Sequence, residues 1–165
     1  MFMALPGPIA ASINHMPLPL VRLAVSQVFR RALQEHPDLF DRLGVHADKL
    51  FGFTPNDLDL TFVVHPAALS ISVYRLGKAP AVAAGVTGSM VTLLALLEGR
   101  IDGDAVFFSR DLGVTGDMEA MLALRNALDD CQFDLPRDLS GLAGPLASPV
   151  RRAAEFVRER ALGQG

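Results

Sequence analysis

The sequence predicts an α+β domain, and three observations lead to this fold class. Two neighbouring segments, 58–64 and 69–74, alternate apolar and polar residues, which is typical of strands with one buried face. Near the N-terminus, residues 17–35 repeat apolar side chains at helical spacing. Further along, a strand–glycine–helix pattern occurs twice. With 165 residues, the chain is long enough for one domain with its own core.

Composition excludes several protein classes. Half of the residues are hydrophobic and 20% are charged, so the chain is not intrinsically disordered. A single cysteine, Cys131, excludes an internal disulfide and a cysteine-based zinc site. The formal net charge is −3, with net values of +2 in 1–37, −7 in 38–148 and +2 in 149–165. We expect no nucleic-acid partner, because such proteins cluster basic residues on one face.

The first 21 residues contain no Asp, Glu, Lys or Arg. They lack the positive start and clean apolar run of a signal peptide, and four prolines interrupt them. Segment 79–97 is also uncharged, but Pro80 and its glycines favour a strand, a turn and a helix over a membrane span. We therefore expect a cytoplasmic protein with an apolar N-terminal arm over 1–16.

The first predicted helix covers 17–35. Its apolar side chains fall on one face, at Val21, Val25, Val28, Phe29 and Ala32. His36-Pro37 ends it, because the residue before a proline is pushed out of the α region. Residues 38–43 are expected to add a short helical turn.

The contacts of the arm and this helix are open between three alternatives. Arg22, Arg30 and Arg31 occupy polar positions, and each arginine near an anionic membrane surface contributes about 1 kcal/mol. Alternatively, the apolar side chains pack on a second copy of the chain or on the domain itself. The side chains concerned are Leu18, Leu20, Leu23 and Val25.

Strands fill the middle of the sequence. A strand over 49–53 precedes the two alternating segments, and residues 65–68 between those segments suit the turn of an antiparallel hairpin. Another strand is expected over 81–87, after residues 75–80 have turned the chain.

The sequence then repeats itself. Residues 85–97 and 113–125 are identical at 8 of 13 positions, at an offset of 28. Each copy reads as a strand end, a glycine exit, a capping residue and an apolar helix. Ser89 and Asp117 are the expected N-caps, because their side-chain oxygens accept hydrogen bonds from unpaired backbone N–H groups. We predict strand 81–87 before helix 90–98, and strand 111–115 before helix 118–130.

The remaining segments complete the predicted organisation. Residues 102–108, between the two copies, are expected to form a short turn that carries aromatic side chains into the core. Residues 132–148 read as a linker, and Ser148-Pro149 begins an amphipathic C-terminal helix over 149–165. The domain with its leading helix then spans 17–131.

No catalytic constellation is evident. The histidines show no paired ligand spacing, and His46 with Asp48 is interpreted as a structural or solvated pair. The glycine pairs of the repeat are too closely spaced for a phosphate loop. We expect no catalytic residue, no metal and no cofactor. Ten phenylalanines and six methionines would suit an adaptable apolar pocket, although composition alone favours a plain core.

Segments 99–108 and 112–117 resemble the hallmark of the sterol-carrier-protein (SCP2-type) family of lipid-binding domains. A helix ends in Gly99-Arg100-Ile101, a turn presents Phe107-Phe108, and a strand ends in Gly116-Asp117 before a helix. The resemblance covers about residues 38–131. A bacterial branch, the accessory factor of oxygen-independent ubiquinone biosynthesis, is similar in its proline-flanked N-terminal helix, in Ser109-Arg110-Asp111 and in Leu128-Asp129-Asp130.

The resemblance implies a five-stranded antiparallel sheet covered by helices and enclosing an apolar tunnel. It implies a non-catalytic protein that holds isoprenoid quinone intermediates or phospholipid while partner enzymes of ubiquinone biosynthesis, such as hydroxylases, modify the quinone head. The alternatives are a general lipid or phospholipid carrier and a non-lipid scaffold module. Peripheral contact with the inner membrane and a homodimer are left open. The expected lipid-binding residues are Phe53, Phe62, Val64, Leu93, Leu97, Phe107, Phe108, Met118, Met121 and Leu122.

Overall fold

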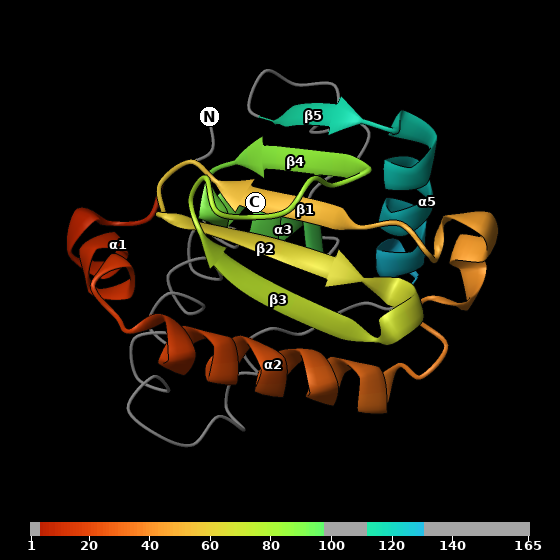
Figure 1. The fold of residues 1–165 in the computed structure, drawn as a ribbon, viewed down its shortest axis with the longest axis horizontal. Helices are drawn as coiled ribbons and strands as arrows, with labels where there is room; N and C mark the ends of the chain where they lie inside the picture. Colours follow the sequence, from red (N-terminus) through yellow and green to blue (C-terminus); the bar gives the residue numbers. More distant parts are fainter. Residues whose placement is uncertain (1–3, 98–111, 131–165) are drawn as a thin grey trace, which may run out of the picture.

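The computed structural model describes residues 4–97 and 112–130. They form an α+β domain in which helices cover a five-stranded sheet, as the sequence predicts (Figure 1). The helical elements are α1 (Gly7–Asn14), α2 (Leu18–Glu35), the 3-10 helices η1 (Asp41–His46) and η2 (Pro66–Ala68), α3 (Met90–Leu97) and α5 (Met118–Asp129). The strands are β1 (Phe51–Pro55), β2 (Leu60–His65), β3 (Ser70–Arg75), β4 (Ala84–Gly88) and β5 (Gly113–Gly116).

The strand order is β3-β2-β1-β4-β5. The predicted hairpin is confirmed, because β2 and β3 pair antiparallel through the η2 turn. The β1–β2 and β4–β5 pairs are antiparallel as well. The expectation of a fully antiparallel sheet was wrong in one respect: β1 and β4 run parallel, with Phe51 opposite Ala84 and Pro55 opposite Gly88.

The parallel pair arises because the connection after β3 crosses the sheet instead of turning at its end. Residues 76–83 return the chain to the starting end of β1, where the Ala83 N–H donates to the Leu50 carbonyl over 2.9 Å. Eight extended residues reach about 26 Å, which is longer than any of these strands. Val82 lies directly over Gly52, so that a Cβ at Gly52 would be 3.1 Å from a Val82 methyl group.

The two repeat copies pair with each other. Their Gly-Val-Thr segments lie antiparallel in β4 and β5, with Val86 opposite Val114 at the centre. The Thr87 hydroxyl reaches the Gly113 carbonyl at 3.4 Å, and the Thr115 hydroxyl reaches the Gly85 carbonyl at 3.5 Å. The repeat is therefore a local two-fold arrangement, and each strand leads into one helix.

Both predicted N-caps are confirmed. The Ser89 hydroxyl accepts from the Thr92 N–H at 3.1 Å, and the Asp117 carboxylate accepts from the Ala120 N–H at 3.0 Å. These bonds satisfy donors in the first turns of α3 and α5, which begin where the repeat predicts. The expected turn over 102–108, the linker over 132–148 and the helix over 149–165 lie outside the described residues.

The N-terminal arm contains a helix that the sequence analysis missed. Pro6 is the N-cap of α1 and Pro17 the N-cap of α2, so these prolines begin helices instead of interrupting the chain. The Leu5 N–H donates to the Asp57 carboxylate at 2.9 Å, and Leu5 packs with Leu58 and Val91. Part of the arm thus packs on the domain, which was one of the three alternatives.

Helix α2 lies along β3 at one edge of the sheet (Figure 1). Val21 packs with Leu60 and Val73, and the Arg22 guanidinium donates to the Val73 carbonyl at 3.0 Å. Leu18 and Val25 also pack here, whereas Leu20 and Leu23 remain exposed. In the described part of the chain, no helix is both long and apolar enough to cross a bilayer.

The turn after β5 generates a prediction about Gly116. This glycine has a φ of +79°, and a Cβ there would clash with the Ala83 carbonyl. Gly77 also has a φ of +79°, but nothing lies within 4 Å of its Cβ position. Gly77→Ala should therefore cost only the left-handed strain of about 1–2 kcal/mol. Gly116→Ala adds a main-chain clash and should cost about 3 kcal/mol or more in urea unfolding. Equal losses in the two variants would contradict this account.

Candidate functional site

The strand register gathers apolar side chains on the helix-covered face of the sheet. Phe51 lies opposite both Val64 and Ala84, and Phe53 lies opposite both Phe62 and Val86. Residues that pair directly across strands share a face. Three of the expected lipid-binding residues therefore lie on one face of β1 and β2, namely Phe53, Phe62 and Val64.

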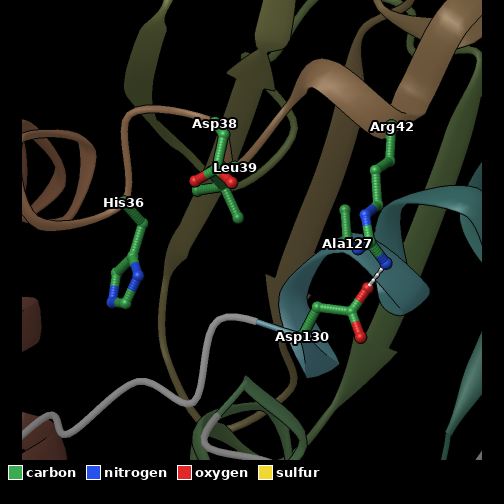
Figure 2. Close-up of a pocket in the computed structure, with 6 residues that line it drawn as sticks. All are labelled: His36, Asp38, Leu39, Arg42, Ala127 and Asp130. Carbon is green, nitrogen blue, oxygen red and sulfur yellow. Dashed lines mark hydrogen bonds and ion pairs between the residues drawn. The ribbon is translucent and has the colours of Figure 1, made fainter.

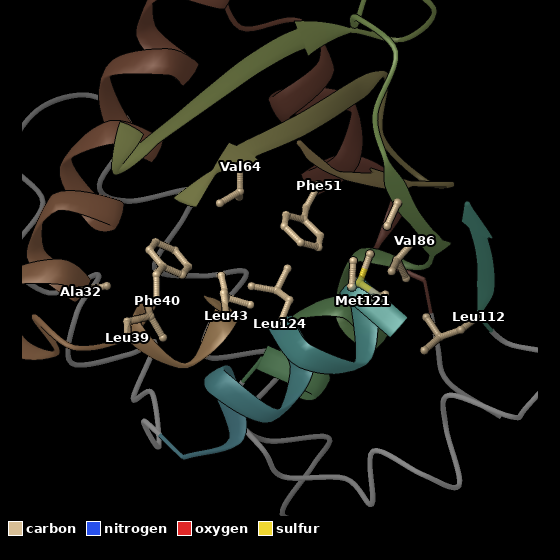
Figure 3. Packing of buried hydrophobic residues seen from close by; sticks show 12 residues of the cluster. Ala32, Leu39, Phe40, Leu43, Phe51, Val64, Val86, Leu112, Met121 and Leu124 are labelled. Atoms are coloured by element: carbon tan, nitrogen blue, oxygen red, sulfur yellow. The ribbon is translucent and has the colours of Figure 1, made fainter. Parts of the chain in front are cut away.

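Helix α5 covers one end of this face. Figure 3 shows Phe51, Val64 and Val86 directed from the sheet toward Met121 and Leu124 of α5. Phe51 has no exposed surface, and both helix residues are 2% exposed. This part of the interface is a close-packed core. Met121 was expected to line a lipid site. Phe51 and Leu124 lie at the centre of this core, but the sequence analysis did not include them among the expected lipid-binding residues.

The apolar face is less completely buried away from this core. Phe53 and Phe62, which pair across β1 and β2, are both only partly buried. Leu93 of α3 and Leu122 of α5 also keep part of their surface accessible while packing against the core cluster. These side chains therefore keep some accessible surface, in contrast to Phe51 and Met121.

The remaining expected residues are placed differently. Met118, the first residue of α5, is 46% exposed and lies at the surface. Leu97 ends α3, but its side chain lies outside the described residues, as do Phe107 and Phe108. Of the expected residues whose side chains the structure describes, Phe53, Phe62, Leu93 and Leu122 keep accessible surface, whereas Val64 and Met121 lie in the close-packed core.

A half-buried ionic cluster fixes the start of α5. The Lys49 ammonium donates to the Asp117 carboxylate at 2.6 Å and lies 2.9 Å from His46 Nδ1. Asp117 is also the N-cap of α5, where the helix dipole favours negative charge. The hydrogen bond from Lys49, followed by that from the Ala120 N–H, holds the pKa of the Asp117 carboxyl below its ordinary value. The cluster joins the residues before β1 to the helix that covers the core.

A polar pocket of about 220 Å³ lies at the other end of α5. An ion pair crosses it between Arg42 of η1 and Asp130 after α5, as Figure 2 shows. Both side chains are substantially exposed, so the pair contributes little to stability. Its charged lining does not suit an aliphatic chain. The pocket is lined by His36, Asp38, Leu39, Arg42, Ala127 and Asp130.

Residues 4–97 and 112–130 contain no group of three or more His, Cys, Asp or Glu side chains that could hold a metal ion. The His46 side chain, which the sequence analysis paired with Asp48, has Lys49 as its hydrogen-bond partner instead.

Fold and site together define a small α+β domain with one helix-covered apolar face. The model of the SCP-2 sterol transfer family matches residues 28–129, which is more than half of the chain. The chain belongs to this family. No curated protein matches the sequence significantly.

One solved structure with a TM-score above 0.5 shares the fold, and two further structures match with lower scores. A structure described as the UbiJ-SCP2 ubiquinone synthesis protein has a TM-score of 0.56 and 20% identity, covering 73% of this chain and 98% of its own. The sterol carrier protein domain 2 of Helicoverpa armigera has a TM-score of 0.45 and 17% identity, and the match covers 65% of this chain and 89% of that domain. Sterol Carrier Protein 2 from Yarrowia lipolytica has a TM-score of 0.44 and 18% identity, covering 65% and 88%.

The ionic cluster generates a prediction about pH. Because the pKa of Asp117 is lower in the folded than in the unfolded chain, its stabilisation is present above the unfolded pKa and is lost as pH falls through the folded pKa. Asp117→Asn keeps a capping oxygen but cannot ionise. The wild type should therefore exceed this variant in stability at neutral pH, and the difference should vanish in acid.

Lys49→Met provides the matched test of the cause. Without the ammonium group, the pKa of Asp117 should rise toward its ordinary value, which carboxyl NMR titration measures directly. The loss of stability caused by Asp117→Asn should also depend less on pH when it is measured in the Lys49→Met protein. An unchanged Asp117 titration in Lys49→Met would show that the lysine is not the main cause.

Proposed function

We propose that this protein is a non-catalytic lipid-binding accessory factor that holds the isoprenoid tail of quinone intermediates and assists oxygen-independent ubiquinone biosynthesis. The observation that carries the proposal is that Phe53 and Phe62, which pair across β1 and β2 on the apolar, helix-covered face of the sheet, are both partly accessible. Membership of a sterol transfer family supports the lipid-binding part. The fold shared with a ubiquinone synthesis protein motivates the quinone part.

The physical basis is burial of hydrocarbon. A polyprenyl chain gains about 0.8 kcal/mol for each CH₂ removed from water, so an apolar site holds it without specific polar contacts. Phe53, Phe62, Leu93 and Leu122 supply accessible aromatic and aliphatic surface from both the sheet and the helices, and Val64 and Met121 remain expected members of the site from the adjoining core. Met121 is unbranched and flexible, which lets its surroundings adapt to an irregular chain.

In this proposal the protein makes and breaks no bond. It shields the tail while partner enzymes of ubiquinone biosynthesis, including hydroxylases, act on the quinone head, and it works in the cytoplasm with peripheral membrane contact. Leu97, Phe107, Phe108 and Met118 remain expected members of the lipid-binding surface. Self-association into a homodimer is a further part of the proposal that solution measurements would decide.

Lipid extraction from the purified full-length chain, followed by mass spectrometry, tests the proposal. We expect isoprenoid quinones or their precursors well above the level found with a control protein purified in the same way. Phospholipid alone would favour a general lipid carrier. No lipid above the control would favour a scaffold whose apolar interior is simply packed.

A pair of variants on β2 tests the site itself. Phe62→Gln removes apolar surface from the proposed site and should weaken binding of a fluorescent polyprenyl probe by about 10- to 100-fold, since burying a phenylalanine contributes about 1.5–3 kcal/mol. Val63→Ala is the control, because Val63 is buried on the opposite face of the same strand. It should lower stability while leaving probe affinity unchanged. Equal affinity losses in both variants would attribute the effect to folding.

A further inference from the structure

Two apolar loop tips project together from one end of the sheet. Val45 of η1 is 85% exposed, and Leu69, which follows η2, is 58% exposed. The two loops are tied together, because the Ala67 N–H donates to the Ala47 carbonyl at 2.9 Å. In Figure 1 the turn between β2 and β3 lies beside the orange η1 segment. We call Val45, Ala67, Ala68 and Leu69, all exposed, the loop-tip patch.

Leu69 lowers the stability of the folded chain in two independent ways. Its φ of +49° makes it the single non-glycine residue with a positive φ in the described part of the chain. This conformation at the end of a helical turn favours glycine or asparagine, and a leucine there is strained. Its aliphatic side chain is also left in water. A glycine would avoid both costs, so the presence of leucine here indicates an interaction outside the folded chain.

The geometry points to a lipid bilayer as the partner, and we propose that the loop-tip patch inserts into a membrane surface. The patch consists of single aliphatic side chains at two loop tips, of which Val45 is 85% exposed, whereas a groove would be needed to seat a helix or peptide. None of its four residues is charged. The charged and titratable groups beside it in sequence are Asp41, Arg42, His46, Asp48, Lys49 and His65, and Asp117 and Asp130 lie against Lys49 and Arg42 from α5 and its end.

This inference rests on the peripheral membrane contact of the proposed function and names the surface that makes it, whereas the lipid-holding sheet face is a separate part of that function. It also differs from the expected contact through the N-terminal arm and α2. The exposed residues of α2 include Arg30 beside Leu23, so binding through α2 would depend on anionic lipid and would fall with salt. Insertion of the loop-tip patch depends on apolar burial and should persist in salt.

Vesicle flotation of the full-length protein tests the proposal, using phosphatidylcholine vesicles with and without phosphatidylglycerol. Wild type should float with both, also in about 1 M salt, where charges are screened beyond about 3 Å. Val45→Ser and Leu69→Gly should each lower the partition coefficient about tenfold, as expected for losing one inserted aliphatic side chain. Leu69→Gly should not lower the urea midpoint, because glycine relieves the strained φ.

Leu76→Ser is the matched control, because Leu76 is similarly exposed, at 53%, but lies beyond the opposite end of β3. It should float like the wild type. The proposal is overturned if wild type does not float, or if the Val45→Ser/Leu69→Gly variant floats equally well. It is also overturned if Leu23→Ser abolishes flotation by itself, or if sedimentation shows that the patch closes a dimer.

Binding of the fluorescent polyprenyl probe separates this proposal from the proposed function. The double variant should bind the probe with wild-type affinity, because the patch lies outside the sheet face that carries Phe53 and Phe62. Absence of probe binding in a wild type that still floats would reject only the lipid-holding function. Probe binding without flotation would reject only the membrane-inserting patch.

Discussion

The antiparallel pairing of the two Gly-Val-Thr-Gly segments is the constraint on which the remaining architecture depends. With Val86 opposite Val114, each strand end delivers the chain to a capped helix start, at Ser89 and at Asp117. Both helices then pack against the same apolar cluster, α3 through Leu93 and α5 through Met121. Because pairing with β1 fixes the side on which Val86 lies, a shift of one residue in this register would place the Val114 side chain on the other face and remove it from the core.

The crossing segment 76–83 gives the two faces of the sheet different surroundings. Val82 closes over Gly52 on one side, and no larger residue fits beneath it without displacement. On the other side, separate helices meet the sheet at different places, with α2 along β3 and α5 over the end formed by Phe51 and Val86. Because separate helices cover different parts of this face, some of its apolar side chains are fully buried and others, such as Phe53 and Phe62, are only partly buried.

Holding a lipid and reaching a membrane place opposite demands on apolar side chains. The first needs surface that is sheltered from water yet still accessible to a ligand, as Phe53 and Phe62 are. The second needs side chains that project into solvent, as Val45 and Leu69 do, at a cost to the stability of the isolated protein. In the two proposals made above, these side chains are separated onto the sheet face and the loop tips, so a mutation in one place should leave the property proposed for the other unchanged.

The sequence by itself determined the elements whose cause is local. Alternation predicted β2 and β3, helical spacing predicted α2, and the repeat predicted α3 and α5 with their caps, because each pattern reflects backbone geometry within a few residues. The arm helix α1 was missed, since Pro6 and Pro17 serve equally as interruptions or as helix starts until tertiary contacts such as Leu5 with Asp57 are known. Only the tertiary structure decided that β1 and β4 run parallel, because the path of residues 76–83 depends on distant partners. It likewise decided that Phe51 is enclosed while Phe53 is partly accessible, since burial depends on which helix lies above each residue, and no local pattern encodes that.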